Sequence, residues 1–284
     1  IMTVISKEEF DNLSKLAEGI QNEQRRSNAL ALLSRMTEVI EGVGDRPITW
    51  QPKLVKVLQA LSKTDGISGN AKPGALVAGS EVVPNGSEVI PLMTWTSRSM
   101  WDPDKDSNRK LCSSPDGKVG YAHGNCRQCP FGNSDKPGVP PPCNKEQAFL
   151  LIRRDFSDMW RLTFHKTQYR DGKDWSDLIK NSRTHPYKRA YAVSGADYEK
   201  KKSIKTIKAS LLDVKEEIPA DELAFLEAMY FKQLNDRKIY IENYHEYVEK
   251  RLTDNDTPAL ENDNSSKLGF DGDKSESSTP NYDV

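Results

Sequence analysis

All four cysteines of the chain fall in one stretch rich in glycine and proline, residues 111–145. They are spaced C-x13-C-x2-C-x13-C. Two thiolates separated by two residues can bind one side of a metal ion, and two more complete the tetrahedron of a structural zinc site. A loop with so few apolar residues cannot bury a core of its own, so it needs such a cross-link. The spacing therefore predicts one structural zinc ion on Cys112, Cys126, Cys129 and Cys143.

One alternative ligand stays open, because His123 could replace one of the thiols. A redox-active CxxC pair usually lies at the start of a helix that follows a strand, and no helical pattern follows GNCRQCPFG. Zinc deaminases need a His-x-Glu motif and a proline before the CxxC pair, whereas Asn125 precedes Cys126 here. With four protein ligands the ion has no open position for water, so we expect a structural role.

The sequence around the cysteines is both basic and aromatic. Residues 95–210 carry a net charge of +10, although the whole chain carries −1. The bases of a single strand stack on exposed aromatic rings, while lysine and arginine follow its phosphates. We therefore expect a sequence-tolerant surface for single-stranded nucleic acid. Its candidate residues are Trp95, Arg98, Trp101, Arg109, Lys110, Arg153, Arg154, Trp160, Arg161, His165, Lys166, Tyr169, Arg170, Lys188, Arg189, Tyr191, Lys200, Lys201 and Lys202.

These residues must be positioned by a small β-rich core. Apolar runs and alternation predict strands near residues 88–95, 147–154, 159–166, 188–195 and 203–212, with one helix over 172–181. Such a count favours an α+β protein with an OB-like small β-barrel and a zinc-binding loop. In the third run Trp160 alternates with Arg161, so Trp160 has a core interpretation beside the binding one.

Composition and periodicity divide the chain into five regions. A capping box of Ser6 and Glu9 starts a helical pattern over residues 6–42, as two helices or one bent helix, and a short helix is expected after Pro52. The expected regions are an N-terminal helical region (1–64), a flexible linker (65–87), the OB-like core with zinc loop 111–145 (88–215), C-terminal helices (216–252) and a disordered acidic tail (253–284).

Two features concern compartment and partners. No stretch approaches eighteen consecutive apolar residues, and the N-terminus resembles no signal peptide, so we expect a cytoplasmic protein with reduced thiols and no membrane partner. The tail 253–284 carries a net charge of −6 and contains Phe270 and Tyr282. A tail of this composition is expected to be disordered and to recruit polymerase or replication proteins.

The stretches LCSSPDG, GYAHGNCRQCPFG and PPCNKEQAFLLI, followed by RLTFHKTQYRDGKDWSDLIKN and HPYKRAYAVSG, resemble a pattern of bacteriophage and plasmid proteins. These are single-stranded DNA-binding proteins with a four-cysteine zinc insertion, including phage cofactors that recruit an early RNA polymerase. The resemblance covers roughly residues 95–215 and matches all four cysteines. It implies an OB-like core that coats single-stranded DNA in the host cytoplasm and serves DNA replication or transcription without catalysis.

Two other classes compete with this interpretation. A zinc-stabilised adaptor would use the basic surface to bind an acidic protein, with no role for nucleic acid. A metal-dependent nuclease would need paired carboxylates, which occur in DPDKD (102–106) and DGKDWSD (171–177). Both carboxylate groups lie in hydrophilic segments typical of turns and helix caps, which disfavours the enzyme.

Overall fold

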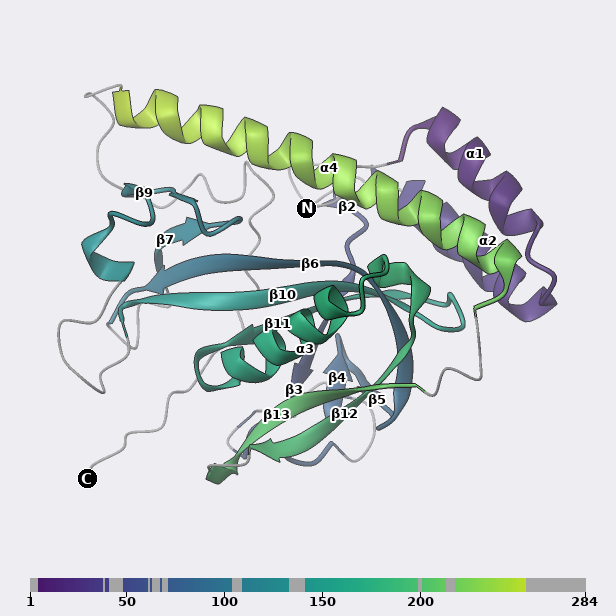
Figure 1. The fold of residues 1–284 in the computed structure, drawn as a ribbon, viewed down its shortest axis with the longest axis horizontal. Coiled ribbons are helices and arrows are strands. Elements are labelled where there is room, and N and C mark those ends of the chain that lie inside the picture. Colours follow the sequence, from purple (N-terminus) through teal and green to yellow (C-terminus); the bar gives the residue numbers. More distant parts are fainter. Residues whose placement is uncertain are drawn as a thin grey trace.

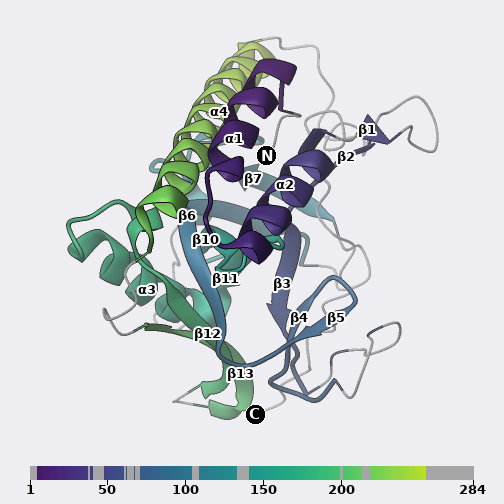
Figure 2. The same ribbon diagram turned by 90° about the vertical axis from the view of Figure 1, so that its right-hand side faces the viewer.

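A curled mixed β-sheet forms the body of the protein, with three of the described helices packed on its outer face and a fourth packed inside the curl (Figure 1, Figure 2). The computed structural model describes residues 5–37, 39–40, 48–60, 62, 67, 71–103, 109–132, 141–198, 201–212 and 218–253. Within these residues the strand order is β13-β12-β6-β10-β11-β3-β4-β5, and β7 also pairs with β6. The fold is therefore α+β, as expected, and the sheet curls into a half-barrel.

The helices are α1 (Lys7–Glu18), α2 (Glu23–Thr37), α3 (Tyr169–Asn181) and α4 (Ala220–Thr253), with 3-10 turns η1 (Pro130–Gly132), η2 (Lys166–Gln168) and η3 (Pro186–Lys188). The strands are β1 (Val39–Ile40), β2 (Ile48–Thr49), β3 (Lys53–Val57), β4 (Leu76–Ala78), β5 (Glu81–Val83), β6 (Ser87–Trp101), β7 (Lys110–Ser114), β8 (Val119–Gly120), β9 (Gly124–Asn125), β10 (Cys143–Arg153), β11 (Met159–His165), β12 (Tyr191–Tyr198) and β13 (Lys201–Leu211).

An outer core lies between the sheet and the helices α1, α2 and α4. The predicted capping box starts α1, with the Ser6 N–H donating to Glu9 Oε2 at 2.7 Å and the Glu9 N–H donating to Ser6 Oγ at 3.2 Å. The helical pattern expected over residues 6–42 forms two helices, α1 and α2, and its end differs, since Val39 and Ile40 form strand β1, which pairs with β2. Buried Glu222 of α4 pairs with Arg25 of α2 and with Arg154 after β10. Arg154 was predicted to contact nucleic acid, but it is a structural residue. Its side chain is buried together with Glu222, and the ion pair between them is shielded from solvent.

An inner core fills the half-barrel and is strongly aromatic. The rings of Phe149 and Trp175 stack with centroids 4.3 Å apart, and Phe164 and Tyr191 pack edge-on against Trp175. Trp160 lies in the same cluster. Trp160 and Tyr191 were both predicted to contact nucleic acid, but they are 3% and 1% exposed. The core interpretation of the alternating pattern is correct for Trp160, since the apolar face of β11 points into the half-barrel. The prediction for Tyr191 of β12 is wrong, because its ring packs in the same core.

Three expected elements differ in the structure. The helix expected after Pro52 is strand β3, which pairs in parallel with β11. The expected linker 65–87 contains β4 and β5, a hairpin that extends the sheet. The two expected C-terminal helices are one continuous helix, α4. For β3 the strand is favoured by contacts with residues far away in the chain. Val55 and Val57 are buried in the inner core, and local helical spacing does not encode such contacts.

The side chain of Gln59, which follows the interior strand β3, reaches the edge strand β13 across the curl of the sheet. The Gln59 amide donates to Lys205 O at 2.9 Å, and Gln59 Oε1 accepts from the Lys205 N–H at 2.9 Å. The Gln168 amide also donates to Lys205 O, at 2.8 Å. Gln59 therefore forms with the β13 backbone the two hydrogen bonds that a neighbouring strand would form. It holds together the open side of the half-barrel, which we call the seam.

Replacing Gln59 with alanine should lower the free energy of unfolding by about 1–2 kcal/mol, because two partly buried hydrogen bonds to the backbone of Lys205 are lost. Urea denaturation of the wild type and the variant measures this difference. Gln128→Ala, which removes an exposed glutamine, is the matched control and should change stability by less than about 0.5 kcal/mol. Equal effects of both substitutions would show that Gln59 does not close the seam.

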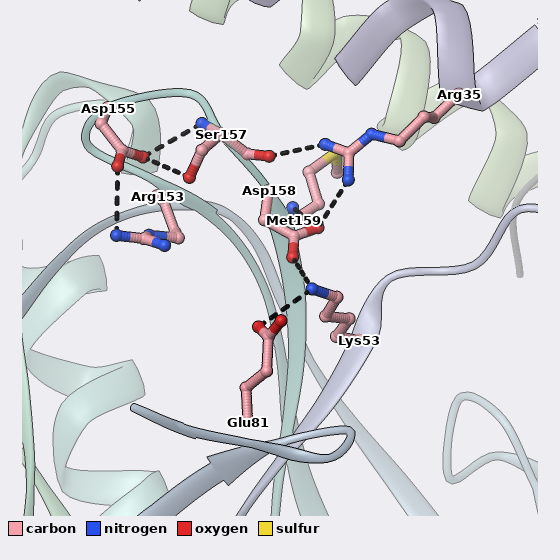
Figure 3. A network of polar contacts seen from close by, with 8 residues as sticks. All are labelled: Arg35, Lys53, Glu81, Arg153, Asp155, Ser157, Asp158 and Met159. Atoms are coloured by element: carbon pink, nitrogen blue, oxygen red, sulfur yellow. Dashed lines mark hydrogen bonds and ion pairs between the residues drawn. The ribbon is translucent and has the colours of Figure 1, made fainter. Parts of the chain in front are cut away.

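An ionic network fixes the turn between β10 and β11 (Figure 3). Buried Asp158 accepts an ion pair from Lys53 Nζ of β3 at 2.9 Å. Arg35 of α2 donates to Ser157 O at 2.5 Å, and Arg153 pairs with Asp155 at 3.1 Å. Arg153, another predicted nucleic-acid contact, is therefore engaged within this turn. The network ties the sheet to α2 and sets the position of the whole β10–β11 hairpin.

Candidate metal centre and nucleic-acid interface

The four cysteines converge on one small cavity. Cys112 lies in β7 and Cys143 begins β10, and both are register partners of Met100 in β6. Cys126 and Cys129 lie between β9 and η1. All four side chains line the same cavity. Its volume of about 10 Å³ is enough for a single water molecule or ion. We call residues 109–132 together with Cys143 the cysteine lobe.

Local geometry brings the sulfur atoms together. Gly120 has no side chain where Cys112 and Cys126 meet: a Cβ there would lie 3.1 Å from Cys112 Sγ and 3.4 Å from Cys126 Sγ. The Ala122 N–H donates to Cys112 Sγ at 3.4 Å. Burial raises the pKa of the Cys112, Cys126 and Cys143 thiols. The thiols would lose their protons on binding a metal, as thiolate ligands do.

The fit to zinc is one of donor chemistry rather than of completed geometry. In the described part of the chain, no three histidine, cysteine, aspartate or glutamate side chains are placed closely enough to hold a metal ion. The four thiols nevertheless share one cavity, and its small volume suits a single ion. His123, the alternative ligand, lines this cavity too. The ligand set thus stays a prediction.

Arg98 was predicted to contact nucleic acid, and the structure places it beside the thiols instead. It lines the cysteine cavity. Burial has the largest effect on the pKa of the Cys143 thiol and raises it. A hydrogen bond from Arg98 and the positive charge of Arg98 act in the opposite direction. A cation in this position would stabilise a cluster of thiolates. Arg98 of β6 therefore lies against the cysteine lobe and lines its cavity.

The long helix α4 carries the cysteine lobe at its C-terminal half. Figure 1 shows α4 running above β6 and β10 from the α1–α2 end toward β7 and β9. Arg237 donates to Pro115 O at 2.8 Å, Tyr244 OH to Ser113 O at 2.7 Å, Arg251 to Tyr121 O at 2.6 Å, and His245 Nε2 lies 3.0 Å from Asp116 Oδ2. This role of α4 was not predicted from the sequence, because polar residues at helical spacing carry no signal for their partners.

Five predicted nucleic-acid residues share the outer face at one end of the sheet. Trp95 of β6 and Thr163 of β11 flank Ala148 of β10, and His165 lies beside Glu146 in the next outward row. Trp101 pairs with Lys110 of β7, whose Nζ lies 4.8 Å from the indole centroid. We call the following residues the outer-face band: Trp95, Trp101, Lys110, Arg161 and His165.

The band combines accessible aromatic surface with positive charge. Trp101 is 38% exposed and His165 is exposed, whereas Trp95 is half-buried. Burial lowers the pKa of Lys110, the negative charge of Glu146 opposes this, and the positive charge of Arg161 adds to it. Glu146 accepts hydrogen bonds from Ser97 and Ser99, which hold its carboxylate on the sheet. The band is thus a compact site of two indoles, one imidazole and two cations, beside the anchored carboxylate of Glu146.

The other predicted contacts lie at several places. Arg109 precedes Lys110 of the band and is half-buried, and Lys166 follows His165 of the band. Burial lowers the pKa of His165, and the positive charge of Lys166 adds to this, so Lys166 borders the band. Tyr169 and Arg170 lie at the start of α3, and Lys188 and Arg189 lie at η3. Lys200, the side chains of Lys201 and Lys202, and the tail from residue 254 onward fall outside the described residues.

The carboxylates considered for nuclease chemistry make local pairs where the structure describes them. Asp171 accepts from Thr206 Oγ1 at 2.6 Å and pairs with Lys208 at 2.7 Å. Asp177 pairs with Lys173, one helical turn away in α3. Residues 104–106 of the other cluster, DPDKD, lie outside the described residues. These pairs give Asp171 and Asp177 structural roles in holding α3.

The fold and the site define an α+β half-barrel protein with a four-cysteine lobe held by a long C-terminal helix. Comparison of the chain with family models, curated proteins and solved structures found no match. Among the described helices, none is both long and apolar enough to cross a membrane. A function for this chain must therefore be argued from its own residues.

Proposed function

We propose that this chain is a single-stranded DNA-binding protein with an OB-like core and no catalytic activity. The observation that carries the proposal is the outer-face band, where the exposed Trp101 indole lies beside Lys110 and the positive charge of Arg161 lies near. A ring can stack on any base, and neighbouring cations can follow the phosphates, so such a site binds single strands without reading sequence. A duplex hides its base faces and would bind less well.

One zinc ion completes this proposal. It would be held by Cys112, Cys126, Cys129 and Cys143 and would have a structural role, because four protein ligands leave no position for water. The proposal of a single ion is supported by the cavity that all four cysteines line. The ion would fasten β7 against β6 and thereby fix the Trp101–Lys110 pair at the edge of the band. The tail 253–284 would recruit polymerase or replication proteins in the host cytoplasm, through its acidic and aromatic residues.

Fluorescence anisotropy tests this function. A labelled oligo-dT of about 20 nucleotides and the same length of duplex are each titrated over a salt series. We expect tight binding of the single strand, weak binding of the duplex, and a log–log salt slope near −0.7 for each phosphate neutralised. Equal weak binding of both forms would contradict the proposal.

A protein adaptor is the second candidate, and one observation favours it. Phe231 and Leu234 of α4 are 51% and 44% exposed and lie one helical turn apart, so they form apolar surface away from the band. An adaptor would bind a polymerase through such residues without any affinity for single strands. The same anisotropy titration separates the two, because an adaptor would leave the oligo-dT signal unchanged.

A further inference from the structure

Arg237 of α4 touches both the outer-face band and the cysteine lobe. Its side chain is 9% exposed. The guanidinium carbon lies 4.6 Å from the centroid of the Trp95 ring, and Nη2 donates to Pro115 O at 2.8 Å. Burial lowers the pKa of Arg237 to about 10, although the negative charge of Asp116 opposes this. At neutral pH the side chain is therefore a buried cation held between an indole and a backbone carbonyl.

A second arginine of α4 makes the same two kinds of contact but stays within the lobe. Arg251 donates to Tyr121 O at 2.6 Å, and its guanidinium carbon lies 4.1 Å from the centroid of the Tyr121 ring. Both arginines thus tie α4 to the cysteine lobe through a carbonyl. They differ in the ring they cover, because Tyr121 belongs to the lobe whereas Trp95 belongs to the sheet.

A guanidinium stacked on an indole restricts the ring more than apolar contact alone, because the attraction depends on the cation staying over the ring face. Trp95 is half-buried and packs against the outer core. Arg237 is itself fixed, since its Nη2 donates to Pro115 O of the lobe. The position of the Trp95 ring therefore depends on α4 and on the loop around Pro115.

We propose that Arg237 is a positioning residue that sets the orientation of Trp95 and couples the cysteine lobe to the outer-face band. Its effect on DNA rests on the proposed function, in which Trp95 is part of the outer-face band that binds the strand. Its effect on the ring does not. The coupling predicts that weakening the Arg237 contact disturbs Trp95, whereas weakening the equivalent Arg251 contact does not.

The first test needs no DNA. The full chain is labelled with 5-fluorotryptophan, and the Trp95 signal in the ¹⁹F NMR spectrum is assigned with Trp95→Phe. We expect Arg237→Gln to shift or broaden the Trp95 signal and to leave those of Trp160 and Trp175 in the inner core unchanged. Arg251→Gln should leave Trp95 unchanged. An unmoved Trp95 signal in Arg237→Gln, or an equal shift in both variants, would overturn the coupling.

The second test measures affinity for oligo-dT. Arg237→Gln should weaken binding about five- to tenfold, and Arg251→Gln should change it less than about twofold. Arg237→Lys keeps the charge but lacks the planar fork, so it should fall between wild type and Arg237→Gln, and it replaces that variant if the glutamine form does not fold. Equal losses in the glutamine variants would show a merely structural role. A wild type that binds no oligo-dT would refute the proposed function, while the NMR result would still decide the role of Arg237.

Discussion

Replacing Cys126 with serine should abolish zinc binding and destabilise the cysteine lobe. Apart from its polar contacts with α4, the lobe has little apolar packing: its buried apolar cluster consists of Met100, Cys112 and Cys143, with Leu111 and Ala122 packed at the edge. Structural zinc contributes about 10–16 kcal/mol of apparent binding free energy in small zinc domains, so its loss should exceed any gain from the remaining contacts. Because the sheet and helices have separate cores, they should stay folded.

The measurement is the metal content of the purified chain together with protease protection of residues 109–132. We expect about one zinc per wild-type chain and none in Cys126→Ser, with new cleavage sites confined to the lobe. His123→Ala is the matched control, because His123 lines the same cavity and is exposed. Full zinc content in Cys126→Ser, or its loss in His123→Ala, would show that the four-cysteine ligand set is wrong.

Replacing Trp101 with alanine should weaken binding of oligo-dT by about tenfold or more. Stacking of one base on an aromatic ring contributes about 1–3 kcal/mol, and Trp101 is 38% exposed beside Lys110. The indole lies at the end of β6, so its removal leaves both cores intact. Anisotropy titrations and thermal unfolding of the same preparations separate lost contact from lost structure.

Phe231→Ala provides the control for this experiment. Phe231 is the more exposed ring, at 51%, but it lies on α4 beside His185 and Tyr230 rather than in the band. Its removal should change the affinity for oligo-dT by less than about twofold. A loss in Phe231→Ala as large as that in Trp101→Ala would mean that the strand follows α4, and the band would no longer be the binding site.

Local patterns in the sequence were sufficient for several elements. The capping box placed the start of α1, and the apolar alternation of β11 separated Trp160 from Arg161. The cysteine spacing predicted that four distant thiols meet, and they share one cavity. In each of these cases the information lies in residue types at short spacing, or in a clustering of one rare residue type.

Other features depend on partners far away in the chain. The helical spacing of Leu54, Val55 and Leu58 predicts a helix for this segment. The segment instead forms β3, which pairs in parallel with β11, about a hundred residues later. Arg98 and Arg154 read as surface cations, but one lies beside thiols and the other in a buried ion pair. Basic residues look alike in sequence, and only the fold determines which of them face solvent.

Photo-crosslinking of the full chain to an oligo-dT that carries 5-iodouridine, followed by mass spectrometry of the linked peptides, tests the central claim most directly. The measurement reports both whether a single strand binds and where it lies. We expect crosslinks at Trp95, Trp101 and His165, that is, in peptides from β6 and β11, and none at Phe231. Crosslinks confined to α3, η3 or the β12–β13 hairpin, or an absence of crosslinks at concentrations that saturate binding, would contradict the assignment of the outer-face band as a single-stranded DNA site.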